Sequence, residues 1–521
     1  MKIINRNTIV YFLFLVFLIF IKIDYRFINE MKCCGDDFDY YSHAYTIAID
    51  FDFDYSNQLI DGHSETYNYE GKIAPLGFVG SGLFASPFLF IGNILDTFSS
   101  NYMVENKLLI YSLSSIFYLF LTVILLFNTL KMLNKDPNIL FISLVLFGSG
   151  LGYYSFERYS MTHVYEVFSI SLIIFITTKI YKDSFNNHKI FISLLPLALA
   201  LSFLTRFTNF YIFLIPLIIK KLFFKNKKLD LIKDKFFVVS SLFSSFIFVQ
   251  IVNGIYGQFT LNPSTLYMDV SKFFNYLDEI SNFRSFFVYN FDIFRTFVFS
   301  QEFGILWFNP IVLSGFIIGV LLLFKKRSFL LGILIMICYL QNFAIIGMWK
   351  STASSYGFRY LLSLVAISII LLHSIENKKL FKFMKFYVLI FSIFGTLAIL
   401  FFESNSSTEL STIYVVNSFG NEVPFSNPKY LSEVLMSFYN IDSYIKIIGS
   451  SFLMIIILKV FSIFIELDLF FTFINKNLSF NISSEIQSNF QFIESTPMYQ
   501  LLIFIIFLLI ISSRIVKKHA L

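Results

Sequence analysis

Long apolar runs separated by short polar linkers dominate this sequence. The first run extends from Ile9 to Ile23. Later runs cover residues 108–130, 139–155, 164–180, 190–205, 207–224, 236–256, 306–324, 329–348, 360–375, 386–402, 444–465 and 499–513. Several are close to the roughly 20 residues that a helix needs to cross a bilayer. The pattern predicts an all-α polytopic membrane protein with about 11–14 transmembrane helices, in one membrane domain covering residues 1–521.

One apolar stretch, Gly80 to Leu95, is interrupted by glycines and by Pro87. We expect an interfacial helix pair there rather than one continuous helix. The alternative, that this stretch spans the membrane, stays open because the charges near the C-terminus conflict with the number of spans given above. With the spans given above, the basic residues 514–518 would lie outside; either this stretch spans or residues 466–499 re-enter the membrane.

The charges of the linkers set the expected orientation. Lysine and arginine concentrate before the first run and in alternate linkers, which indicates the cytoplasmic side. Residues 24–75 hold about eleven carboxylates against three Lys or Arg, and we assign this first loop and the loops 257–303 and 403–443 to the outside. Of the whole chain, 56% is hydrophobic and 14% charged, a balance that excludes a soluble fold.

The first outside loop carries adjacent carboxylates, Asp36 and Asp37, close after the first membrane helix. A carboxylate at that place can take a proton from a hydroxyl group of a substrate, as a general base does. The same side chains can instead cap the helix that residues 38–49 are expected to form, by accepting hydrogen bonds from its first N–H groups. The two interpretations are compatible.

Three further carboxylates, Asp50, Asp52 and Asp54, alternate with phenylalanines and resemble a DxD metal motif. An EF-hand is excluded because Tyr55 stands where its sharp turn needs glycine. A DxD motif holds a metal against a nucleotide diphosphate, and nucleotide sugars are cytoplasmic whereas this loop is assigned to the outside. We therefore favour a solvated loop or a lipid-facing edge and assign no metal site and no certain cofactor; a divalent cation is possible but not indicated.

Other polar residues fall near the ends of predicted spans or in outside loops, where they could converge on the acidic pair. The candidates for substrate binding are His163, Arg206, Glu302, Lys350, Tyr356 and Arg359. The cations among them have an alternative interpretation as interface anchors whose charged ends extend toward the lipid headgroups.

The acidic pair also carries a family resemblance. Asp36-Asp37 followed by Tyr40 and Ala44 resembles the Asp-Glu-x-Tyr-Tyr-x-x-x-Ala run of the GT-C glycosyltransferases, with Asp37 in place of Glu. Members include the protein O-mannosyltransferases and the lipid A aminoarabinose transferases. The run 304–310, GILWFNP, resembles the Gly-Leu-Leu-Phe-Tyr-Ser-Pro run of bacterial members. Trp349 followed by residues 356–360, YGFRY, resembles their Trp…Gly-x-Arg stretch.

The resemblance implies a GT-C-type fold and a glycosyltransferase of a bacterial inner membrane, with its active site on the extracytoplasmic face. The expected partners are a polyprenyl-phosphate-linked sugar as donor, membrane lipid, and a glycan, lipid or protein acceptor, with no nucleic acid. Asp36 or Asp37 is the expected base, and Arg359, Lys350 and Arg206 are expected to hold the lipid phosphate. Two alternatives are a polysaccharide polymerase or ligase with a polyprenyl-diphosphate donor, and a transporter or flippase of lipid-linked saccharide.

Overall fold

A computed structural model gives the fold of the chain. It describes residues 35–59, 67–75, 77–98, 106–156, 158–182, 188–227, 229–266, 304–349 and 359–405, with residues 295, 298–299, 413–416, 422–425, 439 and 467–477. The expected spans 9–23, 444–465 and 499–513 and most of the loops 257–303 and 403–443 lie outside these residues.

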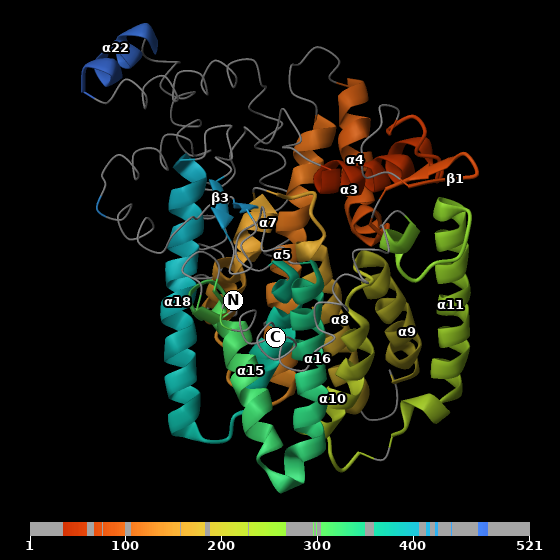
Figure 1. The fold of residues 1–521 in the computed structure, drawn as a ribbon, viewed down its shortest axis with the longest axis vertical. Coiled ribbons are helices and arrows are strands. Elements are labelled where there is room, and N and C mark those ends of the chain that lie inside the picture. Colours follow the sequence, from red (N-terminus) through yellow and green to blue (C-terminus); the bar gives the residue numbers. More distant parts are fainter. Residues whose placement is uncertain are drawn as a thin grey trace, which may run out of the picture.

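The described chain is almost entirely helical (Figure 1). The α-helices are α3 Gly35–Tyr45, α4 Gly80–Phe98, α5 Asn106–Met132, α6 Ile139–Leu146, α7 Gly152–Phe156, α8 His163–Lys182, α9 His188–Thr205, α10 Ile215–Phe223, α11 Lys235–Tyr256, α14 Ile305–Phe308, α15 Pro310–Leu323, α16 Phe329–Trp349, α17 Val365–Ser374, α18 Lys378–Asn405 and α22 Leu467–Asn477. Short 3-10 or π turns, η1 Thr46–Asp50, η2 Phe147–Leu151, η3 Phe210–Leu214, η4 Leu231–Lys233, η5 Pro263–Leu266, η6 Lys326–Ser328 and η7 Arg359–Leu364, adjoin or connect these helices. The strands form two antiparallel hairpins, β1 Tyr67–Tyr69 with β2 Lys72–Ala74, and β3 Ile413–Val416 with β4 Glu422–Phe425.

The helix positions confirm an all-α polytopic membrane protein. Within the described residues, six helices are long and apolar enough to cross a membrane, and three shorter apolar helices accompany them. Between residues 106 and 405 each expected span corresponds to a helix or to consecutive helical segments. The run 139–155, for example, is formed by α6, η2 and α7, with a kink at Gly150, whose φ of 104° lies in the left-handed region.

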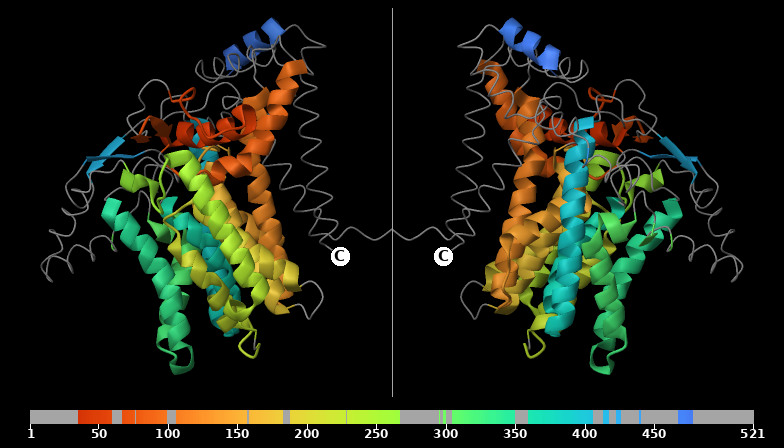
Figure 2. Two further views of the ribbon diagram at one scale, coloured as in Figure 1. Left: turned by 90° about the vertical axis from the view of Figure 1, so that its right-hand side faces the viewer. Right: turned by 90° about the vertical axis from the view of Figure 1, so that its left-hand side faces the viewer.

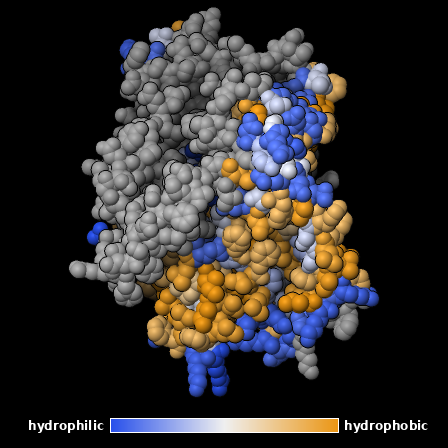
Figure 3. Space-filling view, turned by 45° about the vertical axis from the view of Figure 1, so that its right-hand side comes forward, coloured by the Kyte–Doolittle hydropathy of each residue, from blue (hydrophilic) through white to orange (hydrophobic). Residues whose placement is uncertain are grey.

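The two ends of the helix bundle differ in charge. The linkers after α5, α10, α15 and α17 carry or adjoin most of the described lysines, and Figure 1 shows those after α10, α15 and α17 at the lower end. We call this the basic end. At the opposite end, α3 lies across the tops of the upright helices (Figure 2). Contacts with α3 and with one another place residues 158–162, 206–209 and 359 at the same end. We call this the site end. Figure 3 shows an apolar belt above the hydrophilic lower edge.

The stretch after Gly80 corrects one expectation, because it forms the single continuous helix α4 instead of a helix pair. Pro87 has no N–H for the carbonyl of Leu83, and the Ser86 hydroxyl donates to that carbonyl instead, at 3.2 Å. Both ends of α4 lie at the site end. A Cβ on Gly80 would come within 2.4 Å of the Thr205 nitrogen, and Asp96 accepts a hydrogen bond from the first N–H of α5 at 2.7 Å. The helix therefore does not extend to the basic end.

A buried histidine ties the first loop to the bundle. His43 Nε2 donates to the Gly77 carbonyl at 2.8 Å, and the Tyr55 hydroxyl donates to Nδ1 at 2.7 Å. The Tyr256 hydroxyl of α11 also donates to Gly77, at 2.7 Å. Burial lowers the pKa of His43 to about 4, against the opposing effect of the Gly77 carbonyl, so the ring is neutral. We call His43, Tyr55, Gly77 and Tyr256 the first-loop knot.

Candidate functional site

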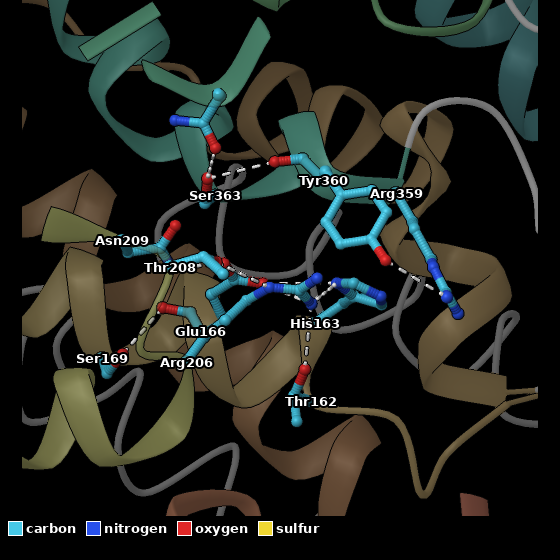
Figure 4. A network of polar contacts seen from close by, with 11 residues as sticks. Thr162, His163, Glu166, Ser169, Arg206, Thr208, Asn209, Arg359, Tyr360 and Ser363 are labelled. Atoms are coloured by element: carbon cyan, nitrogen blue, oxygen red, sulfur yellow. Dashed lines mark hydrogen bonds and ion pairs between the residues drawn. The ribbon is translucent and has the colours of Figure 1, made fainter. Parts of the chain in front are cut away.

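A cluster of charged side chains is buried at the site end (Figure 4). Its centre is Glu166, one turn into α8. Asn209 donates its amide N–H to Glu166 Oε1, while Glu166 Oε2 lies 3.3 Å from His163 Nδ1 and 3.7 Å from Arg206 Nη1. Burying a carboxylate is expensive unless its oxygens are paired, and here both oxygens have partners. With Thr162, Arg359 and Tyr360 added, we call this group the charged cluster.

Local sequence explains why these side chains meet. His163 and Glu166 are three residues apart at the start of α8, so they lie on one face of that helix. Arg206 and Asn209 lie in the turn that follows α9, where the N–H of Asn209 bonds to the carbonyl of Arg206 at 3.3 Å. Arg359 opens the 3-10 helix η7, which contacts α8. Three separate chain segments therefore bring their polar ends to one place.

Two arginines share one aromatic ring in this cluster. The Arg206 guanidinium carbon lies 4.6 Å from the centre of the Tyr360 ring, and that of Arg359 lies 5.3 Å from it. Arg206 also donates to the Thr162 hydroxyl at 3.3 Å, and Arg359 reaches the Tyr360 hydroxyl at 3.5 Å. The ring faces of Tyr360 stabilise both cations without neutralising them. The arrangement can hold an anion between or beside the two guanidinium groups.

The acidic pair lies beside this cluster. Asp37, in the first turn of α3, forms a buried ion pair with Arg158, with 2.5 Å between Oδ2 and Nε. Burial is the largest single influence on Arg158 and lowers its pKa, but Asp37, Tyr153 and Tyr154 together outweigh burial and raise the pKa of the arginine. Arg158 interacts electrostatically with Tyr154, whose ring centre is 4.5 Å from that of His163. A continuous path of contacts thus joins the acidic pair to the charged cluster.

His163 has one ring nitrogen inside the cluster and one facing elsewhere. Its Nδ1 lies 3.2 Å from Arg206 Nη1, while its Nε2 is buried and has no hydrogen-bond partner among the described residues. Arg206, Arg359 and Arg158 are all near enough to His163 to interact with it electrostatically. Three arginines at the site end therefore lie around one histidine.

The structure brings together three of the six residues predicted to bind substrate: His163, Arg206 and Arg359. Lys350, Tyr356 and Glu302 lie outside the described residues. The backbone of Asp36 is described in α3, but its side chain is not. Helix α3 begins at Gly35, so the acids lie within its first turn rather than ahead of it. The catalytic and binding roles of all these residues stay predictions.

The three alternating carboxylates of the first loop form hydrogen bonds within that loop. Asp52 and Asp54 accept hydrogen bonds from the backbone N–H two residues ahead, at 3.0 Å each, and Asp50 accepts from Asn57 at 3.1 Å. Tyr55, which excluded the EF-hand, is buried in the first-loop knot. Across the described part of the chain, no group of three or more His, Cys, Asp or Glu side chains is arranged to hold a metal ion.

Four residues that the structure places at the site are not among the predicted site residues: Arg158, Glu166, Asn209 and Tyr360. Glu166 carried a usable signal, because an ionisable residue inside an apolar span is rare and often functional. Arg158 falls in a short polar linker, and its partner is 121 positions away in the sequence. No local pattern identifies such a pair.

Comparison with protein families gives no family model that matches the sequence, and comparison with curated proteins gives no match. Among solved structures, the fold is similar to the crystal structure of the oligosaccharyltransferase of Archaeoglobus fulgidus in complex with zinc and sulfate. The sequence identity is 13% and the TM-score is 0.41. The match covers 77% of this chain and 56% of that chain, so this chain spans little more than half the length of the protein it matches.

Proposed function

We propose that this protein is a GT-C-type glycosyltransferase. It transfers a sugar from a polyprenyl-phosphate donor to an acceptor hydroxyl on the extracytoplasmic side of a bacterial inner membrane. The observation that carries the proposal is the pair of arginines, Arg206 and Arg359, on the two sides of the charged cluster at the site end. That end is opposite the lysine-rich linkers, which the positive-inside rule assigns to the cytoplasm.

The two arginines suit a lipid phosphate. A guanidinium group offers several N–H donors in a fixed plane that matches phosphate oxygens. Glu166 and Asn209 hold Arg206 in place from one side, and the Tyr360 ring supports both cations. Preorganised cations of this kind stabilise the charge that develops on a departing phosphate.

The ion pair of Asp37 supports Asp36 as the general base. Asp37 already shares its charge with Arg158 at 2.5 Å, which makes it a weaker proton acceptor. Asp36 is its neighbour in the same helical turn and belongs to the same first loop. In this assignment Asp37 and Arg158 anchor α3 across the end of the bundle, and Asp36 is the residue that receives the proton of the acceptor.

The reaction follows from these roles. The acceptor oxygen forms a bond to the anomeric carbon of the sugar while the bond from that carbon to the phosphate oxygen breaks. Asp36 takes the hydroxyl proton, and the electron pair of the broken bond leaves with the polyprenyl phosphate. Phosphate is already a weak base, so the leaving group needs cations rather than a strong acid.

Transfer from labelled donors to membrane acceptors tests the proposal. Membranes that contain the protein are incubated with a labelled polyprenyl-phosphate hexose or pentose, with a labelled polyprenyl-diphosphate saccharide, or with a labelled nucleotide sugar. We expect labelled product from the first donor only. Product from the diphosphate donor alone would favour the polymerase or ligase instead. Arg327→Gln, an exposed arginine at the basic end, is the matched control for arginine variants and should transfer normally.

Impermeant thiol labelling tests the side of the membrane. Ser56 and Asn226 are both exposed, the first in the first loop and the second in a linker at the basic end. In a background without the three native cysteines, Ser56→Cys should react in intact cells and Asn226→Cys only after lysis. Reaction of Asn226→Cys in intact cells would show that the basic end lies outside the cell. The orientation assigned here, and with it the extracytoplasmic donor site, would then be wrong.

A further inference from the structure

A second group of basic side chains is partly buried at the basic end, at the opposite end of the bundle from the charged cluster. The Lys385 ammonium lies 5.2 Å from the centre of the Phe141 ring and 5.6 Å from that of Phe381. The ring of His373 packs against the same two phenylalanines, with centres 6.2 and 5.7 Å apart. Helices α6, α17 and α18 therefore bring a lysine and a histidine around one pair of aromatic rings.

His373 has a ring nitrogen that its surroundings do not use. Its Nδ1 donates to the Ile369 carbonyl at 2.9 Å, one turn earlier in α17. Its Nε2 is buried, and no described residue forms a hydrogen bond with it. Because Nδ1 carries the ring proton, Nε2 is a hydrogen-bond acceptor, and its expected partner is a donor on a water molecule or a ligand. It lies in a site that both Lys385 and Lys135 influence electrostatically.

The lysines here have aromatic neighbours but no carboxylate. Lys135 lies over the Phe223 ring at 5.8 Å, and both Lys135 and Lys385 are half-buried. Among the ion pairs that the described residues form, none joins either lysine to an acidic group. Two half-buried ammonium groups without a counter-ion among the described residues favour an anion from outside the chain. The acceptor nitrogen of His373 favours a hydroxyl group on the same ligand.

We propose that Lys135 and Lys385 hold the phosphate of an anionic lipid headgroup at the basic end, and that His373 Nε2 accepts a hydrogen bond from a hydroxyl group of the same headgroup. Basic pockets between membrane helices on the cytoplasmic side bind such headgroups. The flanking residues of α18 suit the lipid tails, because Phe383 and Phe386 are 68% and 64% exposed. A lipid whose acyl chain lies along these rings has its phosphate at the level of Lys385. The site is independent of glycosyl transfer.

Stabilisation of the purified full-length protein by defined lipids tests the site. The unfolding temperature is followed in phosphatidylcholine nanodiscs with increasing phosphatidylglycerol. The loss of one lysine weakens the binding of an anionic headgroup. Lys135→Gln and Lys385→Gln should therefore each need about fivefold more phosphatidylglycerol for half-maximal stabilisation. Lys382→Gln is the matched control, since Lys382 is exposed on the same helix and should respond like wild type.

Two further measurements separate the site from simpler explanations. Inorganic phosphate, added to nanodiscs that contain phosphatidylcholine only, should not reproduce the stabilisation; if it does, a soluble phosphate and not a lipid is the ligand. Lys385→Arg keeps the charge and should restore most of the response if Lys385→Gln folds poorly. Equal losses in the Lys382, Lys385 and Lys135 variants would show diffuse attraction to the whole basic end and overturn the proposal.

Discussion

Two buried histidines at the site end have partners of different charge. His43 has no exposed surface, and both ring nitrogens are bonded to neutral groups, a tyrosine hydroxyl and a backbone carbonyl. His163 is equally buried, but its Nδ1 lies between Glu166 and Arg206. Burial alone therefore does not mark a functional histidine. The charge of its partners, and whether both of its nitrogens have partners, distinguish the two.

This difference between the two histidines indicates that the first-loop knot and the charged cluster have different roles. The first-loop knot joins α3, α11 and the first loop through neutral hydrogen bonds, and this fixes the structure on which α3 lies. The charged cluster instead holds ionised side chains, and the proposed function assigns its arginines to the donor phosphate. Variants of the knot should change stability with little effect on transfer by the folded protein, and variants of the cluster should do the reverse.

The acid pair gives the largest expected effect. Asp36→Asn removes the proposed base and should reduce glycosyl transfer by about 100- to 10,000-fold, with the unfolding temperature near that of wild type. Asp37→Asn instead leaves Arg158 buried without its counter-charge, which should cost about 3–5 kcal/mol of stability. The measurements are transfer rates per folded protein and thermal unfolding in detergent. Near-normal transfer by both variants would leave α3 with a structural role only.

Arg359 should give the next largest effect. Arg359→Ala removes one of the two guanidinium groups on Tyr360 and should reduce transfer by about 100-fold or more, because a preorganised charge is lost where the phosphate departs. Arg359→Lys should lose less, since it keeps a charge but not the planar fork. Titrations of donor and acceptor on purified variants should show the loss in donor use. A selective loss of acceptor affinity would make Arg359 an interface anchor.

The first-loop knot should contribute a pH dependence of stability that His43→Gln removes. Folding lowers the pKa of His43 from 6.5 to about 4, so the unfolded chain binds the proton more readily between these values. The stability from the neutral ring is therefore complete above about pH 6.5 and is lost as the pH falls toward 4, by about 3 kcal/mol. The measurement is unfolding from pH 7.5 to 4.5 for wild type and His43→Gln. Parallel curves for the two proteins would contradict this assignment.

The helices were predictable because a bilayer imposes a simple rule on the sequence. A segment that crosses it must be apolar for most of its length and must satisfy its backbone internally. The runs from 108 to 402 follow that rule, and helices occur there. The stretch after Gly80 deviates from it, since Ser86 compensates locally for Pro87, and neither the hydrogen bond nor the close approach to Thr205 is visible in an apolar pattern.

The site was only partly predictable because its contacts join distant segments. His163, Arg206 and Arg359 could be selected as polar residues near the ends of spans. Glu166 and Asn209, which position Arg206, depend on how α8 and the turn after α9 pack. The pairing of Asp37 with Arg158 likewise needs α3 to lie across the bundle, a tertiary arrangement that linker charges do not encode.

Removal of single hydroxyl groups gives the smallest and most selective test of the contrast between the two regions. Tyr55→Phe leaves His43 Nδ1 buried without its donor and should cost about 1–2 kcal/mol of stability, because an unpaired buried acceptor loses its hydration without compensation. Tyr360→Phe removes a hydroxyl from the charged cluster but keeps the ring that both arginines contact, and the hydroxyl is 3.5 Å from Arg359. It should therefore unfold and transfer nearly as wild type does. If Tyr360→Phe loses transfer strongly, the hydroxyl and not the ring face holds Arg359; if Tyr55→Phe unfolds like wild type, the knot contributes less than its geometry indicates.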